Sequence, residues 1–475
     1  MTEFFLALDQ GSHASRAIAF TPSGTLLDRE QAAVETAKPR PGWFEHDAEA
    51  LLATVVGTVE RLLARQSAAA CLGAGLATQR SSIVCWDRST GAPLSPVISW
   101  RDTRHQRWLA DLDLDPARVH DITGLRISAH YGASKLRWCL DHLGPVRAAR
   151  DQGRLAWGPL ASFLIFRLTR ERTLAADPAN ASRTLLWDLE ARDWSGEMLA
   201  RFGLDRDALP TAVAEDQGFG HLLAGGGGIP LLRCTGDQSA ALHALGTPAS
   251  DSVYVNAGTG AFLLRPLQRS GDANGLLTSV IRGDASGLAL AREGTVNGAA
   301  TALDAEAGSL GIDTWHEHLA AAGVDDAGVP VFLNGHAGLG SPWWRASFPC
   351  RYAGDGSVGG RLQAVMESVV FMLAENLRRC EQDGGKPQRI VASGGLSRMP
   401  LFCSTLASVA GLQVLRPEVA EATARGLAWL CSGSPAPWPE QGETLRYEAR
   451  AVPALGSRHR RWQAEMQRAL GSLAV

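Results

Sequence analysis

Asp237 stands where a carboxylate could take a proton from a hydroxyl group. It follows a mostly apolar run, Ile229–Leu232, and the pair Thr235-Gly236, and a small-residue helical pattern comes directly after it. This pattern places the carboxylate on the first turn of a helix, just past a buried strand. Because a helix start favours the charged form, we expect Asp237 to be ionised near neutral pH and suited to act as a general base. The alternative for this stretch alone is a helix N-cap, a position that Asp often fills.

Two short hairpins with turns of small and hydroxyl residues are predicted, one in each half of the chain. Their turns are Gln10-Gly11-Ser12-His13 and Ala257-Gly258-Thr259-Gly260. Backbone N–H groups in such turns can hold phosphate oxygens, and the recurrence suggests two related domains that face one ligand. Two ordinary β-turns are the alternative. The four predicted strands cover residues 4–9, 16–20, 252–256 and 261–264.

A third glycine-rich unit follows the predicted strand Arg389–Ala392. Ser393-Gly394-Gly395 leads from this strand towards a helix that begins at Pro400, so the backbone could approach a nucleotide closely. Gly225–Gly228 is predicted to be a flexible loop. The alternation of strands and helices favours an α/β architecture. Helical patterns cover residues 47–65, 135–143, 160–168, 301–310, 361–379, 400–410 and 422–431.

The length of 475 residues predicts two large domains, because one ordinary core does not grow to this size. We place the boundary near residue 246. The predicted division is residues 1–245, residues 246–445 and a C-terminal helical tail of residues 446–475.

Composition and charge exclude several classes of function. A hydrophobic content of 45%, a charged content of 20% and a net charge of −3 are typical of a soluble globular protein and give no electrostatic reason for nucleic acid or membrane as a partner. No apolar stretch reaches the roughly 18 residues that span a bilayer. The N-terminus carries Glu3 and no basic region, so a secretory signal is not expected. Most of the eight scattered cysteines lie in apolar runs, which predicts buried thiols in a cytoplasmic protein, and a zinc site is not expected.

A series of short motifs along the chain resembles the FGGY carbohydrate kinase family, and within it the glycerol kinases most closely. The resemblance covers nearly the whole chain, and its specificity comes from the order of the segments rather than from any one of them. The segments that carry it include LALDQGSHASRAIAF, PGWFEHDAEALLATV, ATQRSSIVCWDRSTGAPL, SWRDTR, ITGLRISAHYGASKLRW, NASRTLLWDL, TGDQSAALHALG, NAGTGAF, EGTVNGA, GLGSPWW and ASGGLSRMPLFCSTLASVAG.

The resemblance implies a fold of two actin/Hsp70-like (ribonuclease H-like) α/β domains with a nucleotide-binding cleft between them. It implies ATP and Mg²⁺ as cofactors, with Asp237 as catalytic base and with Asp9 and Asp237 at the metal. The first domain would hold the acceptor and the second the nucleotide. The implied nucleotide contacts are Ser12, His13, Arg16, Gly258, Thr259, Gly298, Gly394 and Gly395.

The resemblance also implies a site for the acceptor, a small sugar or polyol. Its residues would be Arg80, Ser81, Trp100, His130, Gln238 and Phe262. An arginine can donate a fork of hydrogen bonds to vicinal hydroxyls, and an indole can lie against the carbon skeleton. The alternatives are a surface or ion-paired Arg80, and Trp100 and Phe262 as core aromatics. Lys135, on a predicted helix, is expected to make a structural ion pair.

Three positions depart from the family pattern. Ser81 stands where glycerol kinases carry a glutamate that accepts hydrogen bonds from glycerol, and His130 stands where they carry a tyrosine. His13 occupies a phosphate-loop position usually held by Thr or Ser. A site built to pair polar groups discriminates strongly between acceptors, so these changes argue against a strict glycerol kinase and favour a longer or differently arranged polyol or keto-sugar.

The sequence therefore predicts an ATP-dependent kinase of a small sugar or polyol. Glycerol itself is the second candidate acceptor, and a non-catalytic nucleotide or sugar sensor of the same fold is the alternative class. The lack of a recognisable substrate-binding β-domain argues against a chaperone of the wider actin-like group. The family often forms homodimers or homotetramers, but no interface pattern is visible in this sequence.

Overall fold

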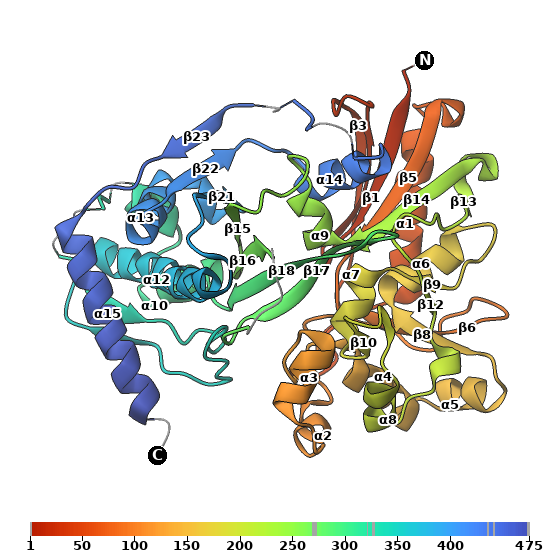
Figure 1. Cartoon of the computed structure of the whole chain (residues 1–475), viewed down its shortest axis with the longest axis horizontal. Coiled ribbons are helices and arrows are strands. Elements are labelled where there is room, and N and C mark those ends of the chain that lie inside the picture. Colours follow the sequence, from red (N-terminus) through yellow and green to blue (C-terminus); the bar gives the residue numbers. More distant parts are fainter. Residues whose placement is uncertain are drawn as a thin grey trace. The chain divides into compact units, whose positions relative to one another are not determined.

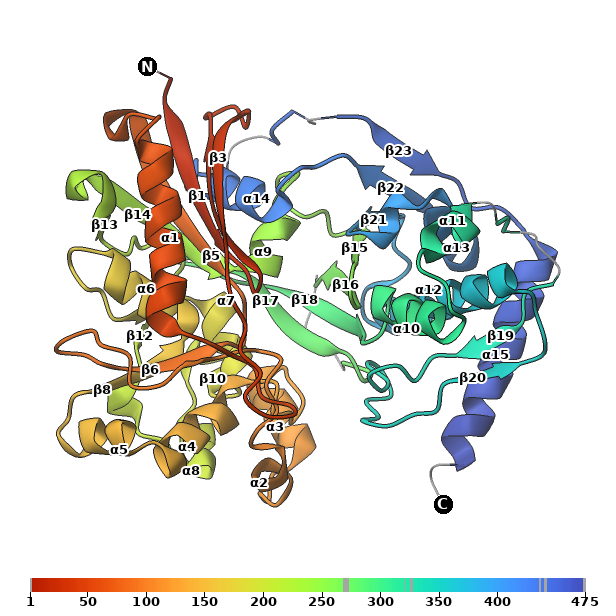
Figure 2. The ribbon, with the colours of Figure 1, turned by 180° about the vertical axis from the view of Figure 1, so that it is seen from behind.

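A computed structural model of the chain describes residues 2–267, 273–320, 322–324, 328–434, 437–439 and 442–472 (Figures 1 and 2). The chain divides into two compact units. The first contains Met1–Pro248, Ser279–Leu290 and Val419–Gln441, and the second contains Ala249–Thr278, Ala291–Glu418 and Gly442–Val475. Both units therefore use segments that are distant in the sequence, whereas the sequence-based division at 245 and 445 was contiguous. No helix among the described residues has the length and hydropathy to cross a membrane.

The first unit is built on a mixed six-stranded sheet with the order β13-β14-β5-β1-β2-β3. Strand β1 runs antiparallel to β2 and parallel to β5, which in turn runs parallel to β14. These strands cover Phe4–Gln10 (β1), Ala14–Phe20 (β2), Leu26–Ala33 (β3), Cys71–Thr78 (β5), His221–Leu222 (β13) and Ile229–Gly236 (β14).

Alternate residues of β1 serve two different apolar clusters, as expected of a strand that is buried on both faces. Phe4 and Leu6 belong to the cluster that includes helix α1 (Ala48–Leu63), and Phe5 and Ala7 belong to the cluster that includes α14 (Ala422–Cys431). The glycine at position 75 of β5 gives α14 room, since a Cβ there would lie 2.8 Å from Leu427. A helix thus covers each face of the sheet.

The rest of the first unit surrounds a four-stranded sheet with the order β4-β7-β6-β8. Its strands cover Glu45–His46 (β4), Ile83–Asp87 (β6), Val97–Ile98 (β7) and Leu155–Pro159 (β8). Two small sheets pair β9 (Ala175–Ala176) with β12 (Thr211–Ala212) and β10 (Trp187–Asp188) with β11 (Asp193–Trp194). The helices are α2 (Gln106–Ala110), α3 (Pro116–Thr123), α4 (Gly132–His142), α5 (Gly144–Asp151), α6 (Leu160–Leu168), α7 (Pro178–Ala181), α8 (Gly196–Phe202) and α9 (Asp237–Leu242).

The second unit is built on a mixed seven-stranded sheet with the order β17-β18-β16-β15-β21-β22-β23, in which β17 and β18 also contribute residues to the first unit. A small sheet pairs β19 (Val331–Leu333) with β20 (Arg351–Ala353). The strands of the large sheet are β15 (Ser252–Ala257), β16 (Ala261–Pro266), β17 (Leu277–Asp284), β18 (Gly287–Val296), β21 (Arg389–Ser393), β22 (Gln413–Pro417) and β23 (Thr444–Tyr447). The helices are α10 (Ala300–Ser309), α11 (Trp315–Ala320), α12 (Val358–Gly384), α13 (Pro400–Ala410) and α15 (Pro453–Ser472).

A buried ion pair fixes α15 to α12 within the second unit. Arg458 donates to both carboxylate oxygens of Glu367, at 2.8 and 2.6 Å, and also to the carbonyl oxygen of Val324 at 3.0 Å. Glu367 is 1% exposed and accepts a further hydrogen bond from Gln363 at 3.1 Å. The C-terminal helix is therefore an integral part of the unit's core, which also contains its residues Trp462 and Met466.

The predicted elements are confirmed with small changes at their ends. Helices α6, α13 and α14 begin and end as expected, and the strands of both hairpins, β1–β2 and β15–β16, extend the predicted ranges by one or two residues. Of the glycines predicted to form a flexible loop, Gly225–Gly227 belong to a short 3₁₀ turn, Ala224–Gly227, in which Gly225 has a positive φ of 67°, and Gly228 follows this turn. Six of the eight free cysteines are buried.

The first unit contains a buried carboxyl group, that of Glu215, which contacts the segment 279–284. One of its oxygens accepts a hydrogen bond from the Gly283 backbone N–H at 3.3 Å, and the other has no partner among the described residues. Burial, reinforced by the nearby charge of Asp177, raises the pKa of Glu215 to about 8, against the weaker opposing effects of Gly283 and of two arginines. At neutral pH this side chain is therefore mostly protonated.

Replacing Glu215 by Gln should change how the stability of the protein depends on pH. In the wild type the folded pKa is above the ordinary value of 4.5, so the folded state holds a proton that the unfolded state releases, and stability falls as pH rises from about 5 to about 8. The neutral glutamine removes this loss of stability. The difference in the free energy of unfolding between the variant and the wild type should therefore grow by about 3 kcal/mol over that range. Urea unfolding at pH 5 and 8.5 measures it. A parallel pH dependence in both proteins would contradict the raised pKa.

Candidate functional site

Asp237 begins helix α9, directly after Gly236 ends strand β14, as the sequence predicted. Its Oδ1 accepts the backbone N–H of Gln238 at 2.7 Å and lies 3.9 Å from Nε of Arg80. Arg80 also donates to the side-chain oxygen of Gln238. Gly236 is required here, because a Cβ at this position would lie 2.5 Å from Cδ of Arg80. Three predicted site residues, Arg80, Asp237 and Gln238, therefore meet at this strand–helix junction.

The surroundings of Asp237 act on its charge in opposite directions. Burial raises the pKa of this carboxyl group above its usual value, whereas Arg80, the Gln238 N–H and Arg183 lower it. The helix start alone favoured the charged form, and the net effect in the folded protein is the reverse, because desolvation outweighs it. A carboxylate with a raised pKa is a stronger base than an exposed one, which suits proton abstraction from a hydroxyl.

Asp9 is the second carboxylate of the site, near the end of strand β1. It is 7% exposed, and its Oδ2 accepts a hydrogen bond from Arg16 at 3.1 Å, the residue opposite it in the β1–β2 hairpin. Burial and the charge of Asp237 raise the pKa of Asp9 to about 6, against the opposing effect of Arg16. The two carboxylates are thus close enough to repel each other.

This pair of carboxylates fits a magnesium ion. Mg²⁺ is commonly bound by one or two carboxylates together with waters and substrate phosphates, and a cation would relieve the repulsion between Asp9 and Asp237. No group of three or more potential His, Cys, Asp or Glu ligands is found in the described part of the chain. Two carboxylates would leave the other positions around such a cation to waters or to a bound ligand.

Trp100 and His130 contact each other in the first unit. Their rings meet edge to face with centroids 5.6 Å apart, and His130 makes a similar contact with Tyr131 at 5.1 Å. The indole N–H of Trp100 donates to the Ser12 hydroxyl at 2.8 Å, and this hydroxyl lies 3.3 Å from the acceptor oxygen of Gln79. Trp100 is half-buried, so it is not a core aromatic. Its bond to Ser12, a link that sequence reasoning missed, joins a candidate acceptor residue to the first hairpin.

Ser81 is 4% exposed, and its backbone has a positive φ of 62°. Its hydroxyl finds no hydrogen-bond partner among the described residues. A buried hydroxyl without a partner is costly, and a ligand's polar group could satisfy it. His13 is exposed at the hairpin turn, and its carbonyl accepts the backbone N–H of Val34 at 2.9 Å.

The second hairpin lies in the second unit, where the start of α10 holds its turn. The backbone N–H of Ala300 donates to the Gly258 carbonyl oxygen, and that of Ala299 donates to the Thr259 carbonyl oxygen, both at 3.0 Å. Gly260 must be a glycine, because a Cβ there would lie 2.9 Å from the Val296 carbonyl, whereas a Cβ at Gly258 would meet nothing within 4 Å. Phe262, predicted to contact the acceptor, is half-buried on β16 of this unit.

A cavity of about 870 Å³ opens in the second unit beside the strand–glycine–helix segment. Gly395 lines it, and the preceding Gly394 has a positive φ of 85°. Gly298 lies at another close approach, where a Cβ would be 2.8 Å from the His336 carbonyl. The remaining lining is largely apolar and was not predicted from the sequence: it includes Ala300, Trp315, Leu319, Leu396, Met399 and Leu401.

Comparison with known proteins identifies a two-domain phosphotransferase of the sugar kinase type. Residues 4–244 match the N-terminal domain of the FGGY family of carbohydrate kinases, and residues 253–433 match the C-terminal domain. The chain belongs to this family.

Curated relatives agree with this assignment. The glycerol kinase of Thermus brockianus is 34% identical over 509 residues, covering 99% of this chain and 99% of the relative. The glycerol kinase of Rhodopirellula baltica is 31% identical over 490 residues, covering 98% and 90%.

Solved structures show the same fold. The glycerol kinase of Plasmodium falciparum with ADP has a TM-score of 0.89 at 20% identity and covers 99% of this chain and 98% of its own. A xylulose kinase from Brucella ovis has a TM-score of 0.86 at 23% identity and covers 99% and 100%. The chain is therefore a carbohydrate kinase, a phosphotransferase that acts on an alcohol group of a sugar or polyol.

Proposed function

We propose that the protein transfers the γ-phosphoryl group of ATP to a hydroxyl of a small sugar or polyol, with Asp237 as general base. The observation that carries this proposal is the strand–helix junction where Asp237, Arg80 and Gln238 meet beside a second carboxylate, Asp9. Phosphoryl transfer needs positioned groups and charge neutralisation more than covalent chemistry.

Each group has a role in this proposal. Asp237 takes the proton of the attacking hydroxyl, and its raised pKa increases its basicity. Arg80 and Gln238 orient the acceptor's hydroxyls. Mg²⁺, held by Asp9 and Asp237, would neutralise phosphate charge when bound. The hairpin turns, with Ser12, His13, Arg16, Gly258 and Thr259, would hold the phosphates, and the cavity beside Gly394 and Gly395 would take the nucleoside, with Gly298 near it.

The acceptor is proposed to be a polyol or keto-sugar larger than glycerol. Glycerol kinases hold glycerol with a glutamate at the position of Ser81. The Ser81 side chain is shorter and uncharged, and its hydroxyl has no hydrogen-bond partner among the described residues. His130 replaces a tyrosine next to Trp100. Glycerol is the second candidate, because the curated relatives carry that name.

A panel of acceptors tests the proposed function. ADP release from Mg·ATP should be measured with C3 to C6 polyols, ketoses and sugar acids, glycerol included. We expect turnover on an acceptor of four or more carbons, with kcat/KM at least about tenfold above that for glycerol, since the altered polar pairing removes contacts to the smaller molecule. Selective turnover on glycerol would retain the kinase and reject the larger acceptor.

A non-catalytic sensor is the remaining alternative, and the exposed His13 in the first phosphate loop is the observation in its favour. A sensor would bind ATP in calorimetry yet release no ADP with any acceptor of the panel. Turnover that depends on the acceptor would eliminate this class.

A further inference from the structure

Lys135 has its charged end buried beneath the proposed acceptor site. The residue lies on the first turns of α4 and is 1% exposed. Its Nζ donates to three backbone carbonyl oxygens: those of His130 at 2.6 Å, Ser99 at 2.9 Å and Ser81 at 3.1 Å. Hydrogen bonds to three backbone carbonyl oxygens therefore take the place of the structural ion pair that the sequence predicted.

The three carbonyl groups belong to three separate segments, and each segment presents a candidate acceptor residue. Ser81 follows Arg80 in a turn with positive φ, Ser99 directly precedes Trp100, and His130 contacts the Trp100 ring. The Ser99 carbonyl also accepts the backbone N–H of Asp102 at 3.0 Å, so both of its lone pairs are used. One ammonium group thus forms hydrogen bonds with the backbone of all three segments.

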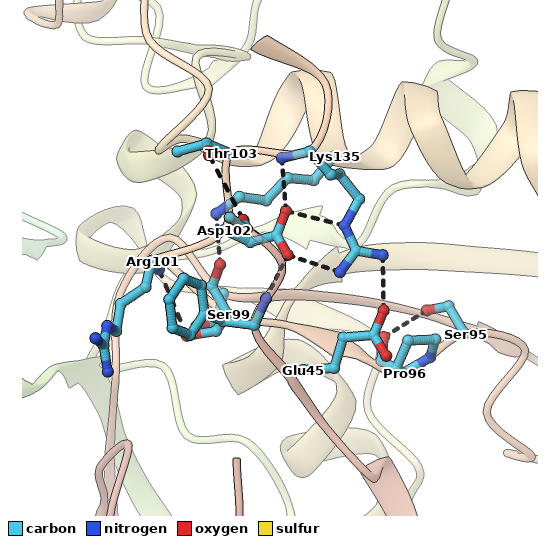
Figure 3. Close-up of polar contacts among 12 residues, drawn as sticks. Glu45, Ser95, Pro96, Ser99, Arg101, Asp102, Thr103 and Lys135 are labelled. Atoms are coloured by element: carbon cyan, nitrogen blue, oxygen red, sulfur yellow. Dashed lines mark hydrogen bonds and ion pairs between the residues drawn. The ribbon is translucent and has the colours of Figure 1, made fainter. Parts of the chain in front are cut away.

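The charges around Lys135 are balanced. Figure 3 shows Asp102 beside Lys135 and Ser99, within a network that extends to Glu45. Asp102 is held by the Arg104 guanidinium at 2.9 and 2.7 Å and by the Phe44 N–H at 2.7 Å, and Arg104 reaches Glu45 at 2.8 Å. Two cations and two carboxylates therefore share one buried region, which reduces the cost of burying the ammonium group.

An ammonium group is the only side-chain group that offers three donors from a single atom on a flexible stem. An arginine carries its donors in a planar fork, which does not match three carbonyl oxygens that converge on one point. Burying a charge merely to fill a core is unfavourable, and an apolar side chain of similar length would fill the same space. The three hydrogen bonds therefore indicate that Lys135 serves to hold the three backbone segments in position.

We propose that Lys135 is the positioning residue of the acceptor site, fixing the segments of Arg80–Ser81, Trp100 and His130 relative to one another. This inference rests on the proposed function, since the acceptor is what these segments would hold. Lys135 does not touch the acceptor in this proposal; it acts through the backbone of the residues that do.

The charge state of Lys135 supports the same role. Burial lowers the pKa of its ammonium group to about 7, while the charge of Asp102 raises it and that of Arg104 lowers it. A neutral amine keeps two donors for three carbonyls. Affinity for the acceptor should therefore weaken as pH rises through about 7.

Two variants and a matched control test the role of Lys135. Lys135→Met removes the donors at similar length, and Lys135→Arg keeps the charge. Arg458→Met breaks the buried ion pair of the second unit and controls for lost stability. With the best acceptor of the panel, Lys135→Met should raise the acceptor KM at least about tenfold, leave the KM for ATP within about twofold, and lose the rise of KM with pH. Lys135→Arg should recover part of the affinity and show no rise of KM near pH 7.

A second measurement needs no turnover and separates this inference from the proposed function. Amide hydrogen exchange of the free protein should speed up in Lys135→Met within residues 79–84, 97–103 and 128–133, and in Arg458→Met only in the second unit. If the wild type phosphorylates nothing, the proposed function fails while exchange still tests the positioning. An unchanged acceptor KM in folded Lys135→Met, or exchange unaltered in the three segments, would overturn the inference.

Discussion

Replacing Asp237 by Asn is expected to lower kcat by about 10²–10⁴-fold, the usual contribution of a positioned general base. The amide oxygen of asparagine can still accept the Gln238 N–H, which Asp237 accepts at 2.7 Å, so helix α9 should keep its start. What is lost is the negative charge that takes the proton and that faces Asp9. The KM for the acceptor should change far less than kcat, because Arg80 and Gln238 keep their positions.

The control for this variant is Glu215→Gln, which makes the same carboxyl-to-amide change at a buried and mostly protonated side chain of the same unit, away from the site. It should keep kcat within about twofold, since Glu215 touches no candidate site residue. Steady-state ADP release with the best acceptor of the panel measures both. An Asp237→Asn protein that retains more than about a tenth of the wild-type kcat would contradict the role of general base.

Adding a single methyl group at Gly258 should weaken ATP binding by at least about tenfold without changing the fold. A Cβ at this position meets nothing within 4 Å in the free protein, so the substitution Gly258→Ala has no internal clash. A phosphate held against the turn would meet the methyl group, because glycine permits a close approach of ligand to backbone. The KM for ATP and the thermal midpoint of the same preparation measure the two effects.

The pair Gly394 and Gly395 provides the matched comparison. Gly394→Ala forces a side chain into a φ of 85° and within 2.5 Å of the Ala257 carbonyl, so it should destabilise the fold as well as ATP binding. Gly395→Ala meets nothing within 4 Å and faces the cavity, and should behave like Gly258→Ala. Unaltered ATP binding in both Gly258→Ala and Gly395→Ala would show that the nucleotide lies elsewhere.

The parts of the molecule that could be predicted from the sequence are those with a local signal. An apolar run followed by a small-residue helix placed Asp237 at a strand–helix junction, and alternating strands around glycine turns placed both hairpins. The order of short motifs predicted the family, which the family models confirm. For Asp237 and the hairpins, the determining residues lie within about twenty positions of one another, and hydrophobic periodicity reports on such distances. The family prediction depends instead on the order of the motifs along nearly the whole chain.

The parts that could not be predicted depend on contacts between distant segments. Nothing near Lys135 in the sequence marks the carbonyl groups of Ser81 and Ser99 as its partners, because backbone acceptors leave no pattern in the side chains. The hydrogen bond from Trp100 to Ser12 spans 88 positions and carries no local signal either. The assignment of α14 to the first unit likewise depends on packing against β1 and not on its own sequence.

The position of α14 has a consequence for how the chain is made. Synthesis delivers β1 and β2 first, with Phe5, Ile18 and Phe20 on the face that α14 later covers, and most of the second unit is translated before Leu427 emerges. Until then, that apolar face of the sheet lacks α14, and exposed strands of this kind are prone to aggregate. The N-terminal unit therefore completes its core late in translation, and a nascent chain released early would need a chaperone to stay in solution.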